Sequence, residues 1–323
     1  MTTHGTARST GDEGQQGPVA GSMEVEWAHG ARFRWSAAGP AIQVHHYDGA
    51  TVILRQSKEL NYEAPFLYLL FGRERALLLD TGATSDPALF PLRRTVDALV
   101  DAWLAAHPEC AGGTYGLVVA HSHAHGDHVA ADGQFADRPH TTVVAHEAAA
   151  VREFFGFGSS WPEAEVPFDL GGRVLDVIGS PGHQEAAVTF YDRRTGVLLT
   201  GDTVLPGRLY AFDGPAYLAT LDRLVAFAAE HPVTHVLGGH VEMGRRPGHE
   251  YPIGASYQPR EQRLELTAAD LSALRDAAVA VAGQPGVHRL PGAVLYLQPS
   301  PSDMRRLVLR GRTRKALRTL IRN

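Results

Sequence analysis

The stretch that decides the fold is HSHAHGDH, residues 121–128. It holds four of the 17 histidines of the chain and one aspartate, whereas an even spread over 323 residues would place fewer than one histidine there. The preceding residues 116–120 are apolar and predict a buried strand. The cluster therefore lies where a strand ends, which is the usual position of ligands on a rigid base.

The spacing within this cluster predicts a metal site. Imidazole and carboxylate are ligands of zinc, iron and related metals. Alternate residues of an extended segment point the same way, so His123 and His125 can bind one ion, while Asp127 and His128 face elsewhere. Two pairs of ligands aimed in two directions are what a two-metal site requires, because its ions lie only ~3.5–4 Å apart.

Further ligands are expected at the ends of later strands, because the cluster alone does not complete two coordination shells. Three candidates have this position: His183 in SPGHQ, Asp202 in VLLTGDT and His240 in HVLGGH. A glycine precedes each of them and lets the backbone turn tightly below the ligand. Taken singly, the two histidines are equally compatible with turns, and Asp202 with a helix cap.

Taken together, these residues in order, with LLLDTG around Asp80 upstream, resemble the metallo-β-lactamase superfamily of hydrolases. The match runs from about residue 65 to residue 242. The resemblance implies an α/β protein, a four-layer αββα sandwich of two mixed β-sheets with the metal site at the sheet edge. It implies that one metal is bound by His123, His125 and His183, that the other is bound by Asp127, His128 and His240, and that Asp202 bridges them. Asp80 would support the site without binding a metal.

Two departures bear on this resemblance. Relatives commonly carry Thr or Ser where this chain has His121, but a register starting there would need an acidic residue at 125 and a histidine at 126. The chain has His125 and Gly126, so the register starts at His123. Relatives that degrade β-lactams usually lack an aspartate at the position of Asp202 and are exported, so Asp202 favours similarity to hydroxyacylglutathione hydrolases and lactonases.

The resemblance predicts a metal-dependent hydrolase that uses a metal-bound hydroxide on a small ester, thioester or lactone. We expect two Zn²⁺ per chain, with Fe²⁺ or Mn²⁺ as alternatives, and a small-molecule acyl substrate. Asp127 is expected to orient the hydroxide, Tyr210 to donate to an oxyanion and Arg208 to clamp an anion, the last two because they follow Asp202 closely. The alternative functions are a mononuclear iron persulfide dioxygenase and a β-lactam hydrolase.

The remaining sequence predicts one domain between two dissimilar ends. Residues 1–23 are polar and predict a disordered leader, residues 24–300 the hydrolase domain, and residues 301–323 a basic tail appended to it. Within the domain, short apolar strands alternate with helices expected over residues 87–106, 216–230 and 267–281, the last opened by a Thr-Ala-Ala-Asp cap. Cys110 is expected to be a surface thiol.

Charge separates the tail from the domain. The net charge is −5, but the last 20 residues carry eight basic residues and no acidic one, which leaves −13 on the rest. An acidic body argues against nucleic acid as a partner, whereas the tail could contact an anionic partner or a membrane surface. No apolar run reaches the ~20 residues of a transmembrane helix, and the first residues lack an apolar block, so a cytoplasmic location is expected. The glycine motifs of phosphate-binding loops, dinucleotide folds and serine hydrolases are absent, which argues against those chemistries.

Overall fold

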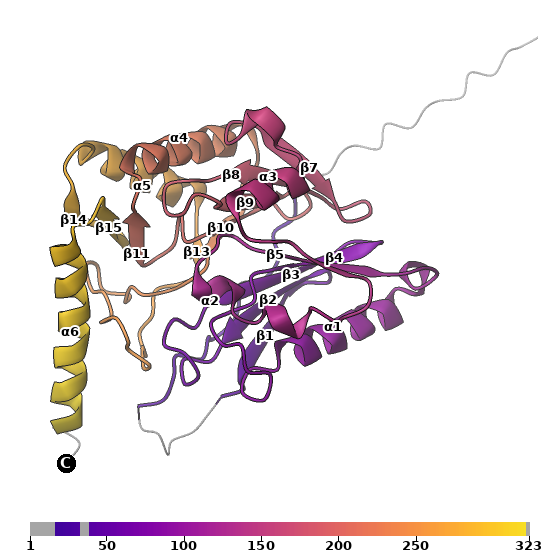
Figure 1. Cartoon of the computed structure of the whole chain (residues 1–323), viewed down its shortest axis with the longest axis horizontal. Coiled ribbons are helices and arrows are strands. Elements are labelled where there is room, and N and C mark those ends of the chain that lie inside the picture. The colour runs from indigo at the N-terminus through magenta and orange to yellow at the C-terminus, as the bar shows by residue number, and fades with distance from the viewer. Residues whose placement is uncertain (1–16, 33–38, 321–323) are drawn as a thin grey trace, which may run out of the picture.

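A computed structural model describes residues 17–32 and 39–320 of the chain, and for residues 313–320 it describes the helical backbone alone. Two six-stranded sheets face each other and helices cover their outer sides, as predicted for an αββα sandwich (Figure 1). A three-stranded sheet and a long C-terminal helix lie at one end of this sandwich. The α/β architecture expected from the sequence is confirmed.

The first sheet contains the N-terminal half of the chain. Its strands lie in chain order: β1 (Ile42–Asp48), β2 (Thr51–Gln56), β3 (Phe66–Phe71), β4 (Arg75–Leu79), β5 (Gly116–Ala120) and β6 (Thr141–Val143). The first four strands are antiparallel neighbours, and β4, β5 and β6 are parallel. Helix α1 (Leu92–Ala106) makes the connection that the parallel pair β4 and β5 requires.

The second sheet contains the C-terminal half. Its order is β13 (Glu265–Leu266), β12 (His235–Gly238), β10 (Val197–Gly201), β9 (Val188–Asp192), β8 (Val174–Gly179) and β7 (Glu165–Asp169). Strands β10 and β12 are parallel, and the other neighbours are antiparallel. The short helix α2 (Gly126–Val129) lies in the connection between β5 and β6 of the first sheet, and α3 (Ala148–Phe155) lies in the connection from the first sheet to the second. Single 3-10 turns occupy Pro108–Cys110, Asp132–Gln134 and Gly158–Ser160.

Alternation along the strands divides the apolar side chains between two cores. Leu77 packs in the core between the sheets, and its neighbour Leu78 packs in the core beneath α1. Because both faces of the sheet are covered, every residue of β3 is buried and the strand is apolar throughout. Replacing Leu77 by alanine would leave a cavity that costs about 2–5 kcal/mol of the free energy of unfolding.

Helices α4 (Gly214–Glu230) and α5 (Ala268–Ala280) cover the outer face of the second sheet. The Asp213 side chain accepts from the backbone N–H of Ala216 and caps α4. Thr267 and Asp270 form the reciprocal cap predicted for α5. Each cap stabilises its helix by about 1 kcal/mol, because it satisfies backbone donors that the first turn leaves unpaired.

The third sheet was not predicted. It contains β11 (Arg208–Ala211), β15 (Ala293–Leu297) and β14 (Gly286–Leu290), with β11 parallel to β15. Its apolar side chains join the core beneath α4 and α5 through Leu209 and Leu295. A parallel pair formed by segments so distant in sequence has no local signature, which is why the strand patterns did not reveal it.

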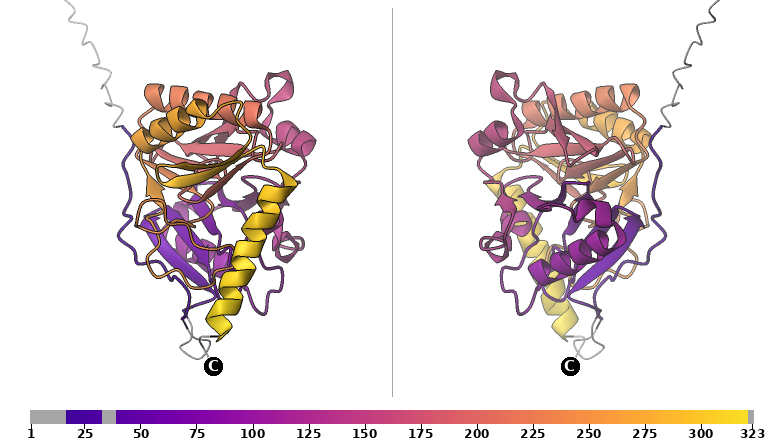
Figure 2. Two further views of the ribbon diagram at one scale, coloured as in Figure 1. Left: turned by 90° about the vertical axis from the view of Figure 1, so that its left-hand side faces the viewer. Right: turned by 90° about the vertical axis from the view of Figure 1, so that its right-hand side faces the viewer.

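The basic tail is a helix that contacts the domain. Helix α6 (Pro301–Leu320) runs down the outside of the molecule from the third sheet (Figure 2). Leu307 is buried, and together with Met304 it packs on Met243, Val294 and Tyr296. The first turns of the tail are therefore part of the folded body, whereas the sequence predicted an appended segment. The sequence pattern failed here because the arginines hide a narrow apolar stripe.

Two other expectations differ from the structure at its margins. Residues 1–16 of the predicted leader lie outside the described residues, but the Ser22 N–H already donates to the carbonyl of Tyr47, and Met23 packs on the core between the sheets. Cys110 is buried rather than a surface thiol, with only 7% of its surface exposed. Among the described residues, no helix is both long and apolar enough to cross a membrane.

Candidate metal centre

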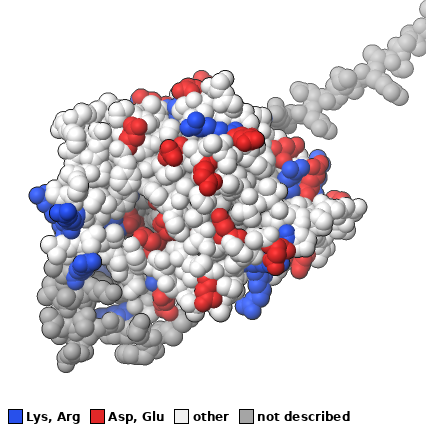
Figure 3. All heavy atoms as spheres, viewed as in Figure 1, with Lys and Arg blue, Asp and Glu red and all other residues white. Residues whose placement is uncertain are grey.

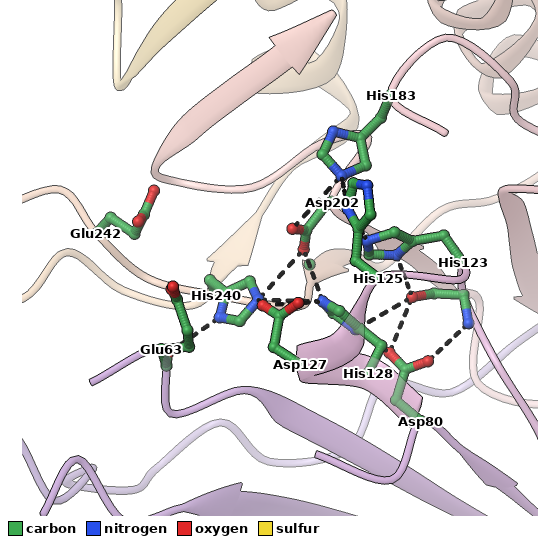
Figure 4. Close-up of polar contacts among 12 residues, drawn as sticks. Glu63, Asp80, His123, His125, Asp127, His128, His183, Asp202, His240 and Glu242 are labelled. Carbon is green, nitrogen blue, oxygen red and sulfur yellow. Dashed lines mark hydrogen bonds and ion pairs between the residues drawn. The ribbon is translucent and has the colours of Figure 1, made fainter. Parts of the chain in front are cut away.

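The seven predicted ligands lie together at one edge of the sandwich, where both sheets contribute strand ends (Figure 4). The first sheet provides the loop and helix that follow β5, and the second sheet provides the turns that follow β8, β10 and β12. The side chains are those of His123, His125, Asp127, His128, His183, Asp202 and His240. Because β10 and β12 are parallel neighbours, their carboxyl ends meet at one edge of the sheet. Asp202 and His240 are therefore brought together although they are distant in sequence.

Close backbone approach allows this convergence. At Gly239, a Cβ atom would lie 2.6 Å from Oδ1 of Asp202 and 2.8 Å from Cε1 of His128. At Gly182, which has a φ of +132°, a Cβ would lie 2.4 Å from the backbone of Tyr217. Only glycine fits these two positions, and both directly precede a ligand.

The first group of ligands contains three imidazoles. Nδ1 of His125 lies 3.0 Å from Nε2 of His123 and 3.0 Å from Nε2 of His183. His123 and His183 are almost fully buried, whereas His125 is partly exposed towards solvent. The three nitrogen atoms therefore surround one point from three directions.

The second group lies next to the first. Nε2 of His240 is 3.1 Å from Nε2 of His128 and 3.2 Å from Oδ2 of Asp127. Asp202 lies between the two groups, with Oδ1 3.5 Å from Nε2 of His128 and Oδ2 3.8 Å from Nε2 of His183. A carboxylate with one oxygen towards each group has the position that a bridge between two cations requires.

Outer hydrogen bonds fix which nitrogen atom of each ring faces inwards. Nδ1–H of His240 donates to the carbonyl of Glu63 at 3.0 Å, and Nδ1–H of His183 donates to the carbonyl of Tyr210 at 2.8 Å. A carbonyl only accepts, so in the neutral rings the inner Nε2 atoms carry lone pairs. The rings are thus oriented before any cation arrives.

Asp80 and Ser122 supply the same orientation for the other rings. The Asp80 carboxylate accepts from the Ser122 N–H at 2.7 Å, from the Ser122 hydroxyl at 2.9 Å and from Nδ1 of His128 at 2.8 Å. Since the Ser122 hydroxyl donates to Asp80, it is left to accept from Nδ1–H of His123 at 3.1 Å. Asp80 is buried behind the ligands, as the resemblance implied, and it positions two of them.

This donor set fits divalent cations. Acceptor atoms of His128 and His240 face each other at 3.1 Å, which is unfavourable unless a proton or a cation lies between them. Within the described part of the chain, the buried Oδ1 of Asp202 also receives no hydrogen bond. Nitrogen and carboxylate ligands in this proportion suit zinc, iron and manganese.

The pKa values show an excess of negative charge at the same place. Burial lowers the pKa of His183 to about 4 and that of His123 well below its usual value, so both rings are neutral, as metal ligands must be. Burial also opposes protonation of His240, but Asp202 and Asp127 outweigh it and raise the pKa of His240 to about 9. The carboxylates therefore draw a proton into a position that a metal ion would fill.

His121 faces away from the ligands. Its Nε2 lies 2.8 Å from Oδ1 of Asp132, which also accepts from the Thr81 hydroxyl at 2.7 Å. Thr81 in turn donates its backbone N–H to the carbonyl of His128. The register beginning at His123 agrees with this placement, and His121 holds the ligand loop instead of binding at its centre.

The two other predicted catalytic residues have different surroundings. Tyr210 lies beside the site, with its ring centroid 6.3 Å from that of His183. Arg208 is buried and bonded to Glu242 and to the carbonyl of Tyr251, so its guanidinium is committed to an internal ion pair. The anion clamp expected at Arg208 is therefore replaced by a structural role that fixes β11 to the segment after β12.

Sequence reasoning missed the residues around the opening of the site. Glu63 and Glu242 lie on the His240 side of the ligands (Figure 4), and acidic side chains gather around the hollow next to α2 (Figure 3). Phe212 is 49% exposed, and its ring centroid is 6.0 Å from that of His183. A backbone carbonyl such as that of Glu63 gives no signal in a sequence, and the apolar side chain of Phe212 is not distinguished from a core residue.

Comparison with known proteins agrees with this geometry. Residues 63–283 match the family described as the metallo-beta-lactamase superfamily. The hydroxyacylglutathione hydrolase of Chelativorans sp. (strain BNC1) is 30% identical over 169 residues, which are 49% of this chain and 59% of that protein. The acyl-coenzyme A thioesterase MBLAC2 of Gallus gallus is 26% identical over 212 residues, which are 55% of this chain and 72% of that protein. The chain thus spans less than two thirds of the length of the hydroxyacylglutathione hydrolase.

Solved structures show a likeness of fold alone. A metallo-beta-lactamase from Pontibacter korlensis is 17% identical, with a TM-score of 0.43 over 62% of this chain and 91% of that one. ETHE1 from Myxococcus xanthus is 18% identical, with a TM-score of 0.43 over 70% of this chain and 84% of that one.

Proposed function

We propose, from the premise that the chain belongs to the metallo-beta-lactamase superfamily, that it is a metal-dependent hydrolase of small thioesters. The observation that carries the proposal is the convergence of seven ligand side chains whose outer nitrogen atoms are held by other groups. Such a site is organised for cations in advance, which reduces the cost of assembling it.

Two divalent ions fit the ligand set best. His123, His125 and His183 would hold one, Asp127, His128 and His240 the other, and Asp202 would contact both. Bound there, they would supply Lewis-acid activation of water and of the acyl carbonyl. We propose Zn²⁺ for both positions, because imidazole and carboxylate ligands suit it and the reaction needs no change of oxidation state.

The side chains of the protein then orient the reactants. Asp127 is partly exposed, and its Oδ2 atom is 3.2 Å from Nε2 of His240, so a carboxylate oxygen faces the space where water enters. The Asp127 pKa is lowered to about 2, since its contact with His240 outweighs its burial, and it remains able to accept a hydrogen bond from water at neutral pH. Phe212 offers an exposed apolar surface beside His183 for the acyl group.

Thioesters are the substrate class that the relatives favour. Two of the similar proteins are named a hydroxyacylglutathione hydrolase and an acyl-coenzyme A thioesterase, and both names describe cleavage of a thioester. Thiolate is also a better leaving group than alkoxide or amide nitrogen, so it needs less help from a general acid.

The test is hydrolysis of an uncharged thioester, S-acetyl-N-acetylcysteamine, by purified protein of known metal content. We expect thiol release that disappears with a chelator and returns with Zn²⁺, and a higher kcat/KM than for the matching oxygen ester, a lactone or a β-lactam. Turnover without metal would contradict the proposal. A single bound iron together with oxygen uptake on a persulfide would instead favour the dioxygenase alternative.

A further inference from the structure

Two regions of opposite charge lie side by side at the opening of the site. The acidic region is the hollow next to α2, around which Figure 3 shows acidic side chains gathered. The basic region is the exposed part of α6 with Arg305, Arg306, Arg310 and Arg312, which we call the α6 arginines. The only described acidic residue of α6 is Asp303 in its first turn.

A short chain of contacts connects the two regions. Tyr210 accepts a hydrogen bond from His183 through its carbonyl, and its ring centroid lies 5.1 Å from that of Tyr296. Tyr296 packs with Leu307 of α6, one turn from Arg310. The α6 arginines therefore stand only a few side chains away from the metal ligands.

The hollow itself offers no available guanidinium from Arg208. Figure 4 shows the side chains of Glu63 and Glu242 on the His240 side of the ligands, and Nε2 of His240 lies 3.2 Å from Oδ2 of Asp127. Arg208 is buried and bonded to Glu242, so its guanidinium is not available to a substrate. The α6 arginines are exposed, so a phosphate group can reach their guanidinium groups from solvent.

We infer that the thioester substrate has a leaving thiol with distant phosphate groups, which bind to the α6 arginines while an uncharged arm crosses the hollow. The inference rests on the proposed thioester hydrolysis and names the carrier of the acyl group. Guanidinium groups bind phosphate through paired hydrogen bonds, and on an exposed helix they can adjust to several positions. Coenzyme A has this form, because its pantetheine arm is about as long as four extended residues, roughly 14 Å.

A glutathione thioester fits this arrangement less well. It carries no phosphate, and its carboxylates lie within about two residues of the sulfur, or roughly 7 Å, so its charged groups stay closer to the ligands than phosphate groups at the end of a pantetheine arm. An anionic membrane is a different partner for a basic helix, but a membrane-bound helix presents an apolar face to the lipid. The apolar stripe that α6 shows in its first turns, Met304 and Leu307, is already packed on the domain.

The experiment compares two thioesters that share the acetyl group, acetyl-coenzyme A and the uncharged S-acetyl-N-acetylcysteamine. In the variant with Arg305→Gln, Arg306→Gln and Arg312→Gln, kcat/KM for acetyl-coenzyme A should fall about tenfold through KM, as three exposed phosphate contacts of modest strength would give. The uncharged thioester should be cleaved within about twofold of wild type. Arg94→Gln is the control, because Arg94 is exposed and belongs to α1, which lies away from α6 (Figure 1).

A binding measurement separates this inference from the proposed activity. By calorimetry, coenzyme A should bind wild-type protein more tightly than pantetheine, which has no phosphate, and the triple variant should bind both equally. Equal binding by wild-type protein would overturn the inference, as would a KM unchanged by the triple variant. Loss of vesicle binding in that variant, with both KM values unchanged, would assign α6 to a membrane instead. Failure of both thioesters to react, with phosphate-dependent binding intact, would count against the proposed function alone.

Discussion

The metal pocket and helix α6 use charged side chains in opposite ways. In the pocket the ligands are largely buried and their outer atoms are bonded to other protein groups, such as Asp80 or the carbonyl of Glu63. The α6 arginines, at 305, 306, 310 and 312, are exposed, and Arg306 contacts Asp303 at 3.6 Å. Fixed and desolvated groups provide chemistry, because their orientation does not have to be acquired during the reaction, whereas exposed flexible charges provide recognition.

The largest effect is expected from breaking the pocket at His123. His123→Ala removes a ligand that Ser122 orients, and we expect loss of metal and a fall in kcat/KM of at least about a thousandfold, or roughly 4 kcal/mol of barrier. Elemental analysis and thioester turnover measure both. The control is His46→Ala, an exposed histidine of β1. Retention of metal and turnover by His123→Ala would remove this residue from the site.

The next effect concerns the division of the pocket into two groups. Asp202→Asn should reduce the metal content from about two ions per chain to about one and lower kcat/KM about a hundredfold, because an amide oxygen is a poor bridge between cations. The fold should persist, since Asp202 is in a turn after β10 and not in the apolar core. Unchanged metal content with full activity would show that Asp202 does not bridge.

A smaller effect is expected from Asp80, which binds no metal in our proposal. Both carboxylate oxygen atoms of Asp80 accept hydrogen bonds from Ser122 and His128. In Asp80→Asn one of these atoms becomes an NH2 group, which cannot accept, so at least one buried hydrogen bond is lost. We expect metal affinity to fall about 10- to 100-fold, as for other supporting groups, with activity restored at high metal concentration. Competition with a chromogenic chelator gives the affinity. Unaltered affinity would mean that the ligand orientation does not depend on Asp80.

The histidine cluster could be predicted from sequence because its ligands follow strands in a compact pattern, and the structure brings all seven predicted ligands together. The partners of the ligands could not be predicted in the same way. His183 is oriented by the carbonyl of Tyr210, and any residue at that position would provide one. The anion-binding role predicted for Arg208 was wrong for a related reason. Its partner Glu242 is distant in sequence, and the sequence pattern does not show which arginines are buried.

The helix α6 shows a second limit of sequence patterns. Its high density of arginine predicted a solvated tail, but Leu307 and Met304 are enough to pack its first turns on Met243 and Tyr296. When a helix contacts its neighbour along only one narrow stripe, few of its residues are apolar, and the helical periodicity of apolar residues is difficult to recognise in the sequence. The third sheet, which provides that neighbour, was itself missing from the sequence prediction.

A pH experiment on the metal-free protein sharpens the contrast between the pocket and α6. Asp202 and Asp127 outweigh burial and raise the pKa of His240 in the folded state to about 9, above its unfolded value near 6.5. The stability that this proton provides is complete below about pH 6.5 and is lost as the pH rises through about 9. We therefore expect Tm to fall by several degrees over this interval without metal and to change less with Zn²⁺ bound. A Tm that is independent of pH in the metal-free protein would contradict this assignment.

The smallest effect is expected from the shorter of two deletions that divide α6. Deleting residues 304–323 removes the buried side chain of Leu307, which costs about 1.5–3 kcal/mol of the free energy of unfolding, and exposes Tyr296 beside Tyr210. Deleting residues 313–323 keeps Met304 and Leu307 in place. It should change Tm no more than a typical surface substitution does, and it should leave kcat/KM for the uncharged thioester within about twofold of wild type. Thermal denaturation and initial rates distinguish the two cases. If the shorter deletion abolished turnover of an uncharged substrate, α6 would have to act on the pocket itself, and the separation between fixed chemistry and exposed recognition would fail.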